Sequence, residues 1–351
     1  MKIQNFFENG GNTQERTEQF LSMFQGRKGW DREALTYEPK DDAVHIEDTN
    51  DQWEWWYFDF SFDNGYKAVA TFHYHNMMMI PHVPTMQLFL YPPEGPPKVK
   101  LWALRPGQEN FAAKDRCLVR MGDLMAEDTG EAYRLVMDMK DLSVDLTIKN
   151  VIRPWKAGTG ILWSDPDTGL ETGWVVPVPR GHAQGTIKMD GKIMEVQGHA
   201  YHDHNWGNGP MEKPFRGWYW GRLFDPTYTL IYGWVIPREE GMPVASPFML
   251  AKGSEIVVST DRISVTIEEE KRDDRHGFEI PVRLRVRCQG PGVDLDCLLS
   301  TKRVVEALKL PRGDGAFHYY RFLANYEGEI EVDGVREQVS GETFHEMMLL
   351  D

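Results

Sequence analysis

The sequence predicts an all-β protein built from antiparallel strands, arranged as a sandwich or a barrel. Most of the chain consists of short runs that alternate between apolar and polar residues and are separated by turn signals. Asn64-Gly65, Asp190-Gly191 and Asp333-Gly334 each stand between two such runs, and these dipeptides are typical of type I′ hairpins. The sequence contains no Rossmann GxGxxG, P-loop or GxSxG motif, so it predicts neither a nucleotide site nor a serine-hydrolase elbow.

The strands are expected where the alternation is clearest. Because successive side chains of a strand point to opposite faces, each of these runs has one apolar face that can cover a core. In chain order the predicted strands cover residues 53–62, 66–75, 133–139, 143–151, 185–189, 192–204, 229–237, 255–259, 263–269, 282–290, 293–300, 328–341 and 342–350.

Two segments have the spacing of a helix instead. In residues 13–24, Phe20, Leu21 and Phe24 recur at helical spacing after an Asn12/Thr13 cap. Residues 302–310 (KRVVEALKL) repeat the pattern and end at a proline. A few short helices are therefore expected beside the strands.

The chain of 351 residues is long enough for two domains of ordinary size. The strand pattern breaks at NWGNGP, residues 205–210, and restarts with FRGWYWGRLF. We therefore predict an N-terminal helical segment over residues 1–38, a first β domain over residues 39–208 and a second over residues 209–351.

Composition argues against several classes of protein. The 39 Lys and Arg residues against 54 Asp and Glu residues give a net charge of −15, so no nucleic acid is expected as a partner. No apolar stretch has the length of a membrane span, and stable membrane insertion is not expected. The 3 cysteines cannot form a disulfide framework, and the first residues lack the apolar core of a secretory signal. We expect a soluble cytoplasmic protein.

Aromatic residues are abundant, with 12 Trp, 13 Tyr and 17 Phe. Each tryptophan brings a large apolar surface and an indole N–H that needs a partner. Such a set is compatible with an aromatic-lined cavity, and equally with the core of a large β protein.

The densest polar cluster is GHAYHDHNWG, residues 198–207. On a strand, His202 and His204 share one face, while Tyr201 and Asp203 point to the other. Burial would bring such groups toward the pKa values that general acid–base catalysis requires. A zinc site is the rival interpretation, with His73 and His75 as a second His-x-His pair, but no spacing fixes the ligands, and no metal is predicted.

Two aromatic clusters accompany the histidines. Alternation in residues 53–60 places Glu54 and Trp56 on one face and Tyr57 on the other. Glu54 is expected either at a solvated strand end or buried and protonated, and a buried neutral acid can donate a proton. In residues 218–222, Trp218, Trp220 and Arg222 share a face, which suits either a cavity wall with cation–π stacking or a core strand whose arginine reaches solvent.

EWWYF, GHAYHDHNWG and WYWGRL form an ordered set, followed by a closing GETFHEMMLL. Together they resemble the AttH-like/carotenoid 1,2-hydratase (hydroxyneurosporene synthase) family, which is related to kievitone-type hydratases and lipocalin-like Diels–Alderases. The likeness covers roughly residues 40–351. It implies two calycin/lipocalin-like antiparallel β domains, an open barrel or sandwich followed by a barrel, with an apolar pocket at or near their junction.

The resemblance also implies a chemistry. Hydratases of this group add water to an isolated alkene without a cofactor, and relatives that act as cyclases hold a polyene in a reactive shape. The His-Asp-His-Asn-Trp motif maps onto residues 202–206 and the EWW motif onto residues 54–56. The hydratases also use a Tyr and an Asp beyond this motif; Tyr232 in TLIYGW matches the tyrosine, and no Asp stands beside it.

We therefore predict a cofactor-independent acid–base hydratase or lyase that acts on a hydrophobic unsaturated small molecule, such as a terpenoid, a prenylated aromatic or a polyketide. In this hypothesis Asp203, held by His202 or His204, delivers the proton. A pericyclase and a non-catalytic carrier of lipophilic ligands are the alternatives, and a homodimer is compatible with the aromatic surface. The candidate catalytic residues are Asp203, His202, His204, Glu54 and Tyr201. The candidate substrate-binding residues are Trp56, Tyr57, His73, His75, Trp206, Trp218, Trp220, Arg222 and Tyr232.

Overall fold

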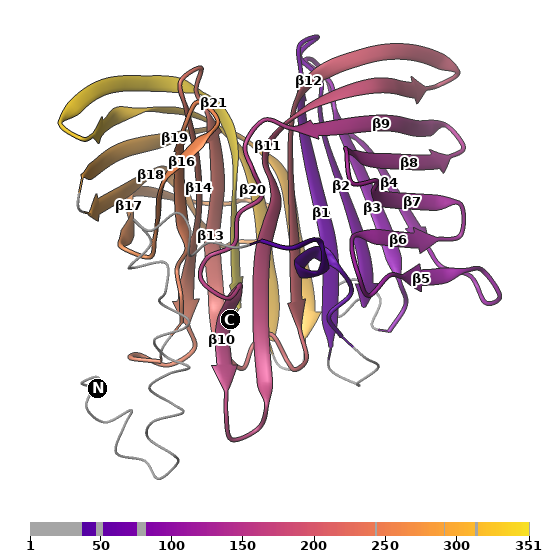
Figure 1. The fold of residues 1–351 in the computed structure, drawn as a ribbon, viewed down its shortest axis with the longest axis horizontal. Helices are drawn as coiled ribbons and strands as arrows, with labels where there is room; N and C mark the ends of the chain where they lie inside the picture. The colour runs from indigo at the N-terminus through magenta and orange to yellow at the C-terminus, as the bar shows by residue number, and fades with distance from the viewer. Residues whose placement is uncertain are drawn as a thin grey trace. The chain divides into compact units, whose positions relative to one another are not determined.

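Two curled antiparallel sheets make up nearly all of the structure, a computed structural model (Figure 1). It describes residues 37–46, 52–75, 82–242, 244–290, 292–312 and 315–350. Within these ranges the only helix is a 3-10 helix, η4 (Pro39–Asp42). The sheets are half-barrels, which confirms the predicted all-β, lipocalin-like architecture. The helix predicted over residues 13–24 lies outside the described residues.

Contacts divide the described chain into two units, each treated by itself below. Residues 37–156 and 167–210 form the N-terminal unit, and residues 157–166 and 211–350 form the C-terminal unit.

The first sheet has the order β4-β3-β2-β1-β12-β11-β9-β8-β7-β6-β5 among its described strands, with β10 outside this order. Strand β1 therefore lies between β2 and β12, which brings residues 53–62 next to residues 198–207. The strands are β1 (Trp53–Phe62), β2 (Lys67–His75), β3 (Thr85–Tyr91), β4 (Lys98–Ala103), β5 (Asn110–Ala112), β6 (Leu118–Met121), β7 (Leu124–Asp128), β8 (Tyr133–Met139), β9 (Leu142–Asn150), β10 (Ile161–Asp165), β11 (Leu170–Met189) and β12 (Lys192–Gly207).

The second sheet has the order β16-β15-β14-β13-β21-β20-β19-β18-β17. Here too the first strand, β13, pairs with the last, β21. The strands are β13 (Phe215–Phe224), β14 (Tyr228–Pro237), β15 (Phe248–Lys252), β16 (Glu255–Thr260), β17 (Ile263–Arg272), β18 (Glu279–Gly290), β19 (Val293–Arg312), β20 (Gly315–Val332) and β21 (Val335–Leu350).

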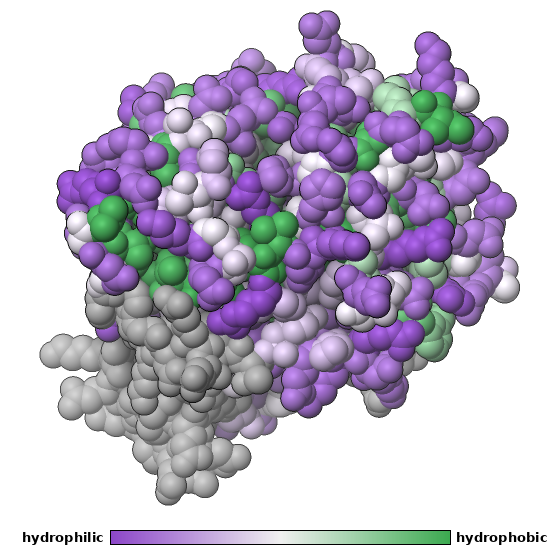
Figure 2. Space-filling model, turned by 45° about the horizontal axis from the view of Figure 1, so that its top comes forward, coloured by the Kyte–Doolittle hydropathy of each residue, from purple (hydrophilic) through white to green (hydrophobic). Residues whose placement is uncertain are grey.

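Each unit has its own apolar core on one face of its sheet. In the N-terminal unit, Trp56, Phe58 and Phe60 of β1 contribute alternate side chains to that core. In the C-terminal unit, Phe322 of β20 and Met347 of β21 do the same. Figure 2 shows that the visible surface is mostly hydrophilic, with small separate hydrophobic groups. The period-two pattern arises because one face of each sheet packs into a core, as in β8 and β9, where buried residues alternate with more exposed ones. Strands β1 and β3 are buried on both faces.

Two of the three predicted type I′ hairpins are present. Asp190 and Gly191 have φ values of 50° and 77°, and Asp333 and Gly334 have 51° and 81°, as the type I′ turn requires. The prediction for Asn64-Gly65 is wrong in type. Only Gly65 is left-handed, with φ 86°, and the Phe62 N–H donates to the carbonyl of Tyr66 across a three-residue loop.

The helix predicted over residues 302–310 is also wrong, because these residues belong to strand β19. The ladder between β19 and β20 shifts register between Thr301 and Arg303 and again between Val304 and Glu306. Each shift places an extra residue in one of the two paired strands, so the apolar side chains of β19 change from one face of the sheet to the other along the strand. Two such shifts within a short segment produce apolar spacing that resembles a helix.

A search for membrane-crossing helices gave no candidate in the described ranges, since no helical segment there is both long and apolar enough.

Candidate active site

Strands β1 and β12 carry most of the predicted site residues. Their antiparallel register sets Trp56 opposite His204, Tyr57 opposite Asp203 and Phe58 opposite His202. Because side chains alternate, the sheet separates these residues into two groups. Glu54, Trp56, His202, His204 and Trp206 lie on the core face, and Tyr57, Tyr201 and Asp203 lie on the opposite face.

The core-face group is a buried network of two histidines and two carboxylates. His204 Nε2 lies 3.0 Å from Glu54 Oε1, and His204 Nδ1 lies 3.4 Å from Asp42 Oδ1. His202 Nε2 lies 3.1 Å from Asp42 Oδ2. All four side chains are at most 1 % exposed. Aromatic rings close the network, with Trp56 stacked on His204 at 4.2 Å and Phe58 on His202 at 3.9 Å between ring centroids.

Opposite charges stabilise this network against the cost of burial. Burial raises the pKa of the Asp42 carboxyl, but the imidazoles of His202 and His204 outweigh burial and hold that pKa below its ordinary value. Burial lowers the pKa of His204, yet hydrogen bonds to Asp42 and Glu54 raise it above its ordinary value. Of the two alternatives for Glu54, the solvated strand end is wrong and burial is correct: Glu54 is 0 % exposed, and its Oε1 accepts a hydrogen bond from the His45 backbone N–H at 2.7 Å.

The opposite face holds two tyrosine–aspartate pairs on neighbouring strands. The Tyr201 hydroxyl donates to Asp203 Oδ2 at 2.8 Å, and the Asn205 side-chain amide donates to Asp203 Oδ1 at 2.7 Å. The Tyr57 hydroxyl donates to Asp59 Oδ2 at 3.4 Å. The rings of Tyr57 and Tyr201 meet edge to face, with centroids 6.2 Å apart. All four members of the two pairs are at most 7 % exposed.

This geometry corrects the predicted role of the histidines toward Asp203. We expected His202 or His204 to hold that carboxylate, but the pleat places both imidazoles on the far side of the sheet from it. Asp203 accepts hydrogen bonds from Tyr201 and Asn205 instead. The carboxylates that contact the histidines are Asp42 and Glu54.

The other predicted residues of the N-terminal unit lie around these two groups. On the core face, Trp206 stacks on His45 with centroids 3.7 Å apart. On the opposite face, His73 lies 5.9 Å from the Trp55 ring, and burial lowers the pKa of His73 to about 4. His75 Nδ1 lies 2.9 Å from the side-chain amide of Gln52. A four-histidine site is excluded, because β1 separates β2 from β12 and His73 lies on the other face from His202.

In the C-terminal unit, Trp218, Trp220 and Arg222 of β13 share the face that points away from the core. Only Tyr219 of this stretch packs into the core. The Arg222 guanidinium lies 4.4 Å from the centroid of the Phe224 ring and is buried rather than reaching solvent. Tyr232 points the other way, into the core, where burial raises the pKa of its hydroxyl.

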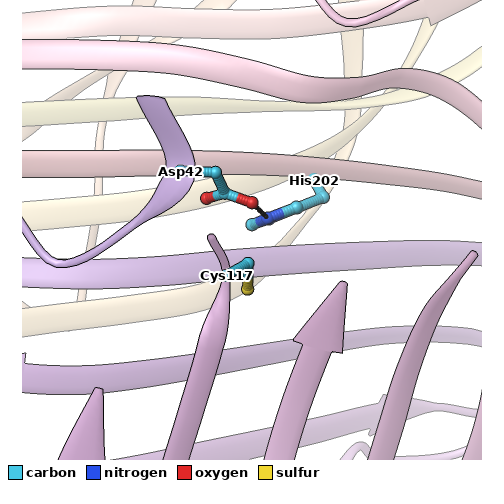
Figure 3. Close-up of side chains that lie close together, drawn as sticks. All are labelled: Asp42, Cys117 and His202. Carbon is cyan, nitrogen blue, oxygen red and sulfur yellow. Dashed lines mark hydrogen bonds and ion pairs between the residues drawn. The ribbon is translucent and has the colours of Figure 1, made fainter. Parts of the chain in front are cut away.

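Sequence reasoning missed two groups of buried polar residues. In the C-terminal unit, the buried Arg321 guanidinium donates hydrogen bonds to Glu306 at 2.7 Å and to Glu346 at 2.8 Å. In the N-terminal unit, Asp42 and Cys117 lie beside His202 (Figure 3). Among the described residues these three are close enough together to hold a metal ion. No sequence pattern indicated that Asp42 belongs to the site, since it stands in a short polar segment before the first strand.

A protein-family model described as AttH-like matches residues 100–348. The chain belongs to the AttH-like family. This confirms the family that the EWWYF and GHAYHDHNWG motifs indicate.

The AttH-like chain is also similar to curated enzymes and to solved structures. It is 22% identical to the acyclic carotenoid 1,2-hydratase of Rubrivivax gelatinosus over 57% of this chain and 52% of that protein. The chain spans about a fifth to a half of the length of the curated relatives it matches.

Two solved structures share its fold. One, from Nitrosomonas europaea, carries the name AttH; its TM-score is 0.64 at 16% identity, over 89% of this chain and 96% of that one. The other is kievitone hydratase from Nectria haematococca, with a TM-score of 0.60 at 16% identity over 90% of this chain and 93% of that one. At this identity the likeness establishes the fold of the AttH-like chain.

Proposed function

We propose that this protein is a cofactor-independent hydratase or lyase that acts on a hydrophobic, unsaturated small molecule. The observation that carries the proposal is the pair of buried Tyr–Asp contacts on one face of β1 and β12, Tyr57 with Asp59 and Tyr201 with Asp203. Membership of the AttH-like family and the names of two relatives, a carotenoid hydratase and kievitone hydratase, support it.

In the proposed reaction Asp203 is the proton donor. Its carboxyl group gives a proton to one carbon of an isolated alkene, and the resulting cation forms at the other carbon. Water adds to the cation, and one proton of that water returns to the Asp203 carboxylate, so the acid is regenerated. Atoms and charges balance with water as the only co-reactant. The reverse sequence eliminates water, which makes the same site a lyase.

Neighbouring groups orient this acid. In the carboxylate form, Tyr201 and Asn205 each donate to one oxygen of Asp203, which fixes the direction of the group. In the acid form that gives the proton, Oδ2 carries the hydrogen and the Tyr201 hydroxyl rotates, because a hydroxyl can accept as well as donate. Trp55 and Trp174 stand beside Asn205 in the register of β1 and β11, so aromatic rings lie next to the acid. Aromatic faces stabilise a desolvated cation by about 2 kcal/mol in favourable cases.

The core-face network acts as a support in this proposal. His202 Nδ1 donates to the carbonyl of Tyr57 at 2.8 Å, which ties β12 to β1 directly behind the Tyr57 and Asp203 side chains. We therefore assign His202 and His204 to positioning rather than to proton transfer.

The test is product analysis in ¹⁸O-labelled water with an acyclic carotenoid and a prenylated aromatic as trial substrates. We expect labelled alcohol from the wild type and a loss of turnover of about 10²- to 10⁴-fold in Asp203→Asn. Asp123→Asn, a change at an exposed turn aspartate, is the matched control and should keep full activity.

Other outcomes would contradict the proposal. Full turnover by Asp203→Asn removes the proposed acid. An isomerised product without label and with a flat pH profile indicates a cyclase, in which shape provides most of the rate. Binding of apolar ligands with no turnover indicates a carrier.

A further inference from the structure

Three side chains that can bind metal meet in the core of the N-terminal unit: the carboxylate of Asp42, the thiol of Cys117 and the imidazole of His202 (Figure 3). One ligand atom of each lies within 4.8 Å of the others. They come from separate parts of the chain, namely the last residue of η4, the residue before β6, and β12. Each of the three is 0 % exposed.

The imidazole of His202 is oriented as in known metal sites. Its Nδ1 lies 2.8 Å from the Tyr57 carbonyl oxygen, and because that oxygen only accepts, Nδ1 carries the proton. Nε2, the other ring nitrogen, therefore faces Asp42 Oδ2, 3.1 Å away. A cation between these two atoms would contact both of them. Metal-binding histidines commonly donate the other ring N–H to a backbone carbonyl in this way.

Neighbouring side chains fix the orientation of the Asp42 carboxylate. Its Oδ1 lies 3.4 Å from His204 Nδ1. Its Oδ2, which faces His202, accepts a hydrogen bond from the Tyr133 hydroxyl at 2.8 Å. Hydrogen bonds that hold a carboxylate in place are typical of the surroundings of metal ligands.

The structure thus assigns to Asp42, Cys117 and His202 a buried site for a divalent metal ion, with Zn²⁺ as the expected occupant. Thiolate, imidazole and carboxylate are the ligands that zinc takes in proteins. The ion would replace the Cys117 thiol proton, which leaves to solvent together with any proton on His202 Nε2, because thiolate and neutral imidazole are the forms that bind metal. One thiolate and one carboxylate then neutralise the two charges of the ion, which a dry core requires.

This site goes beyond the proposed function. It lies on the core face of β12, on the other side of the sheet from Asp203, so its role is structural. The ion would connect η4 to β6 and β12. The Trp56 indole N–H, which donates to the Asp42 carbonyl at 3.0 Å, already anchors the same segment.

The experiment measures metal in the full-length chain. The protein is purified without a metal-affinity step, analysed for zinc by mass spectrometry, stripped with a chelator and reloaded with Co²⁺. We expect one equivalent of metal per chain and a thiolate-to-cobalt charge-transfer band. The band should disappear in Cys117→Ser. It should persist in Cys288→Ser/Cys297→Ser, the matched control that removes the two buried cysteines of the C-terminal unit.

A second variant separates ligand binding from folding. Tyr133→Phe removes the hydroxyl that supports Asp42 and leaves all three ligands, so zinc affinity should fall about 10- to 100-fold. Less than a tenth of an equivalent of metal, no charge-transfer band in the wild type, or loss of the band in the Cys288/Cys297 double variant would overturn the assignment. If Cys117→Ser does not fold, the metal content and the charge-transfer band of the wild type and of the Cys288/Cys297 double variant still decide whether the site binds metal.

Discussion

Buried histidines in this protein differ in charge because their surroundings differ. His345 in the C-terminal core is 0 % exposed, stacks on Phe322 with centroids 4.7 Å apart, and makes no hydrogen bond with either ring nitrogen. Burial alone lowers the pKa of His345 to about 3. His204, next to Asp42 and Glu54, has a raised pKa instead. His345 is therefore neutral in the folded protein and is a source of acid sensitivity.

Replacing His345 by phenylalanine should stabilise the protein, and more so in acid. Unfolded histidine binds a proton below about pH 6.5, whereas the folded pKa of about 3 keeps His345 neutral. The free energy of unfolding of the wild type is thus unaffected by His345 above pH 6.5. It falls as the pH drops from 6.5 toward 3, because only the unfolded state then binds the proton. We expect His345→Phe to gain about 2 kcal/mol more at pH 5 than at pH 7, measured by urea unfolding. The exposed His182→Phe is the control; parallel pH curves for wild type and His345→Phe would contradict the assigned pKa.

At the residue scale, the alternation of side chains correctly predicted which residues share a face of the sheet. It did not predict which residues contact the histidines. His202 and His204 do share a face, and Glu54 and Trp56 share it with them. Asp42, which contacts both histidines, stands about 160 positions earlier in a short 3-10 helix. No period connects residues so far apart, so the partner of a buried histidine is decided by tertiary packing alone.

At the element scale, the largest error concerns residues 302–310. Their composition suits a helix, but β20 offers them a ladder that pairs Arg303 with Leu323 and Leu310 with Phe317. Tertiary pairing outweighs local propensity when a neighbouring strand satisfies backbone groups in this way. The same segment contributes the buried Glu306 that binds Arg321, at one of the register shifts. A bulge therefore re-aims a side chain that the apolar pattern assigned to a helix face.

Close packing between β11 and β12 gives a prediction for Gly173. A Cβ atom built on this glycine would lie 2.1 Å from the Trp206 ring, which itself stacks on His45. Gly173→Ala must therefore displace the indole, and we expect a loss of about 1–3 kcal/mol in the free energy of unfolding. Urea unfolding measures the loss, and near-UV circular dichroism reports the displaced tryptophan.

The matched control for Gly173 is a compensating change. A smaller ring in Gly173→Ala/Trp206→Phe makes room for the added methyl group, so the double variant should lose less than the two single losses combined. Strict additivity of the two losses would show that the contact between these residues does not limit packing.

At the scale of the whole molecule, both sheets follow one scheme in which the first strand returns to pair with the last. Strand β1 pairs with β12, and β13 pairs with β21, each across more than a hundred residues. Periodicity predicted the antiparallel class, since each strand shows one apolar face. It did not predict these pairings, because loop closure depends weakly on length and leaves many partners open. The ordered motifs, unlike periodicity, indicated the family and with it the arrangement of the strands.

Each unit carries one buried histidine with a strongly lowered pKa: about 4 for His73 in the N-terminal unit and about 3 for His345 in the C-terminal unit. Both are neutral when folded and protonated when unfolded below about pH 6.5, so each makes stability fall toward acid by about 1.4 kcal/mol per pH unit. Because the two histidines belong to different units, the gains of His73→Leu and His345→Phe between pH 7 and pH 5 should add within about 0.5 kcal/mol. Urea unfolding of both single variants and the double variant checks this sum. A double variant no less acid-sensitive than either single variant would show that acid stability is set elsewhere, by carboxylates that must be protonated before either unit unfolds.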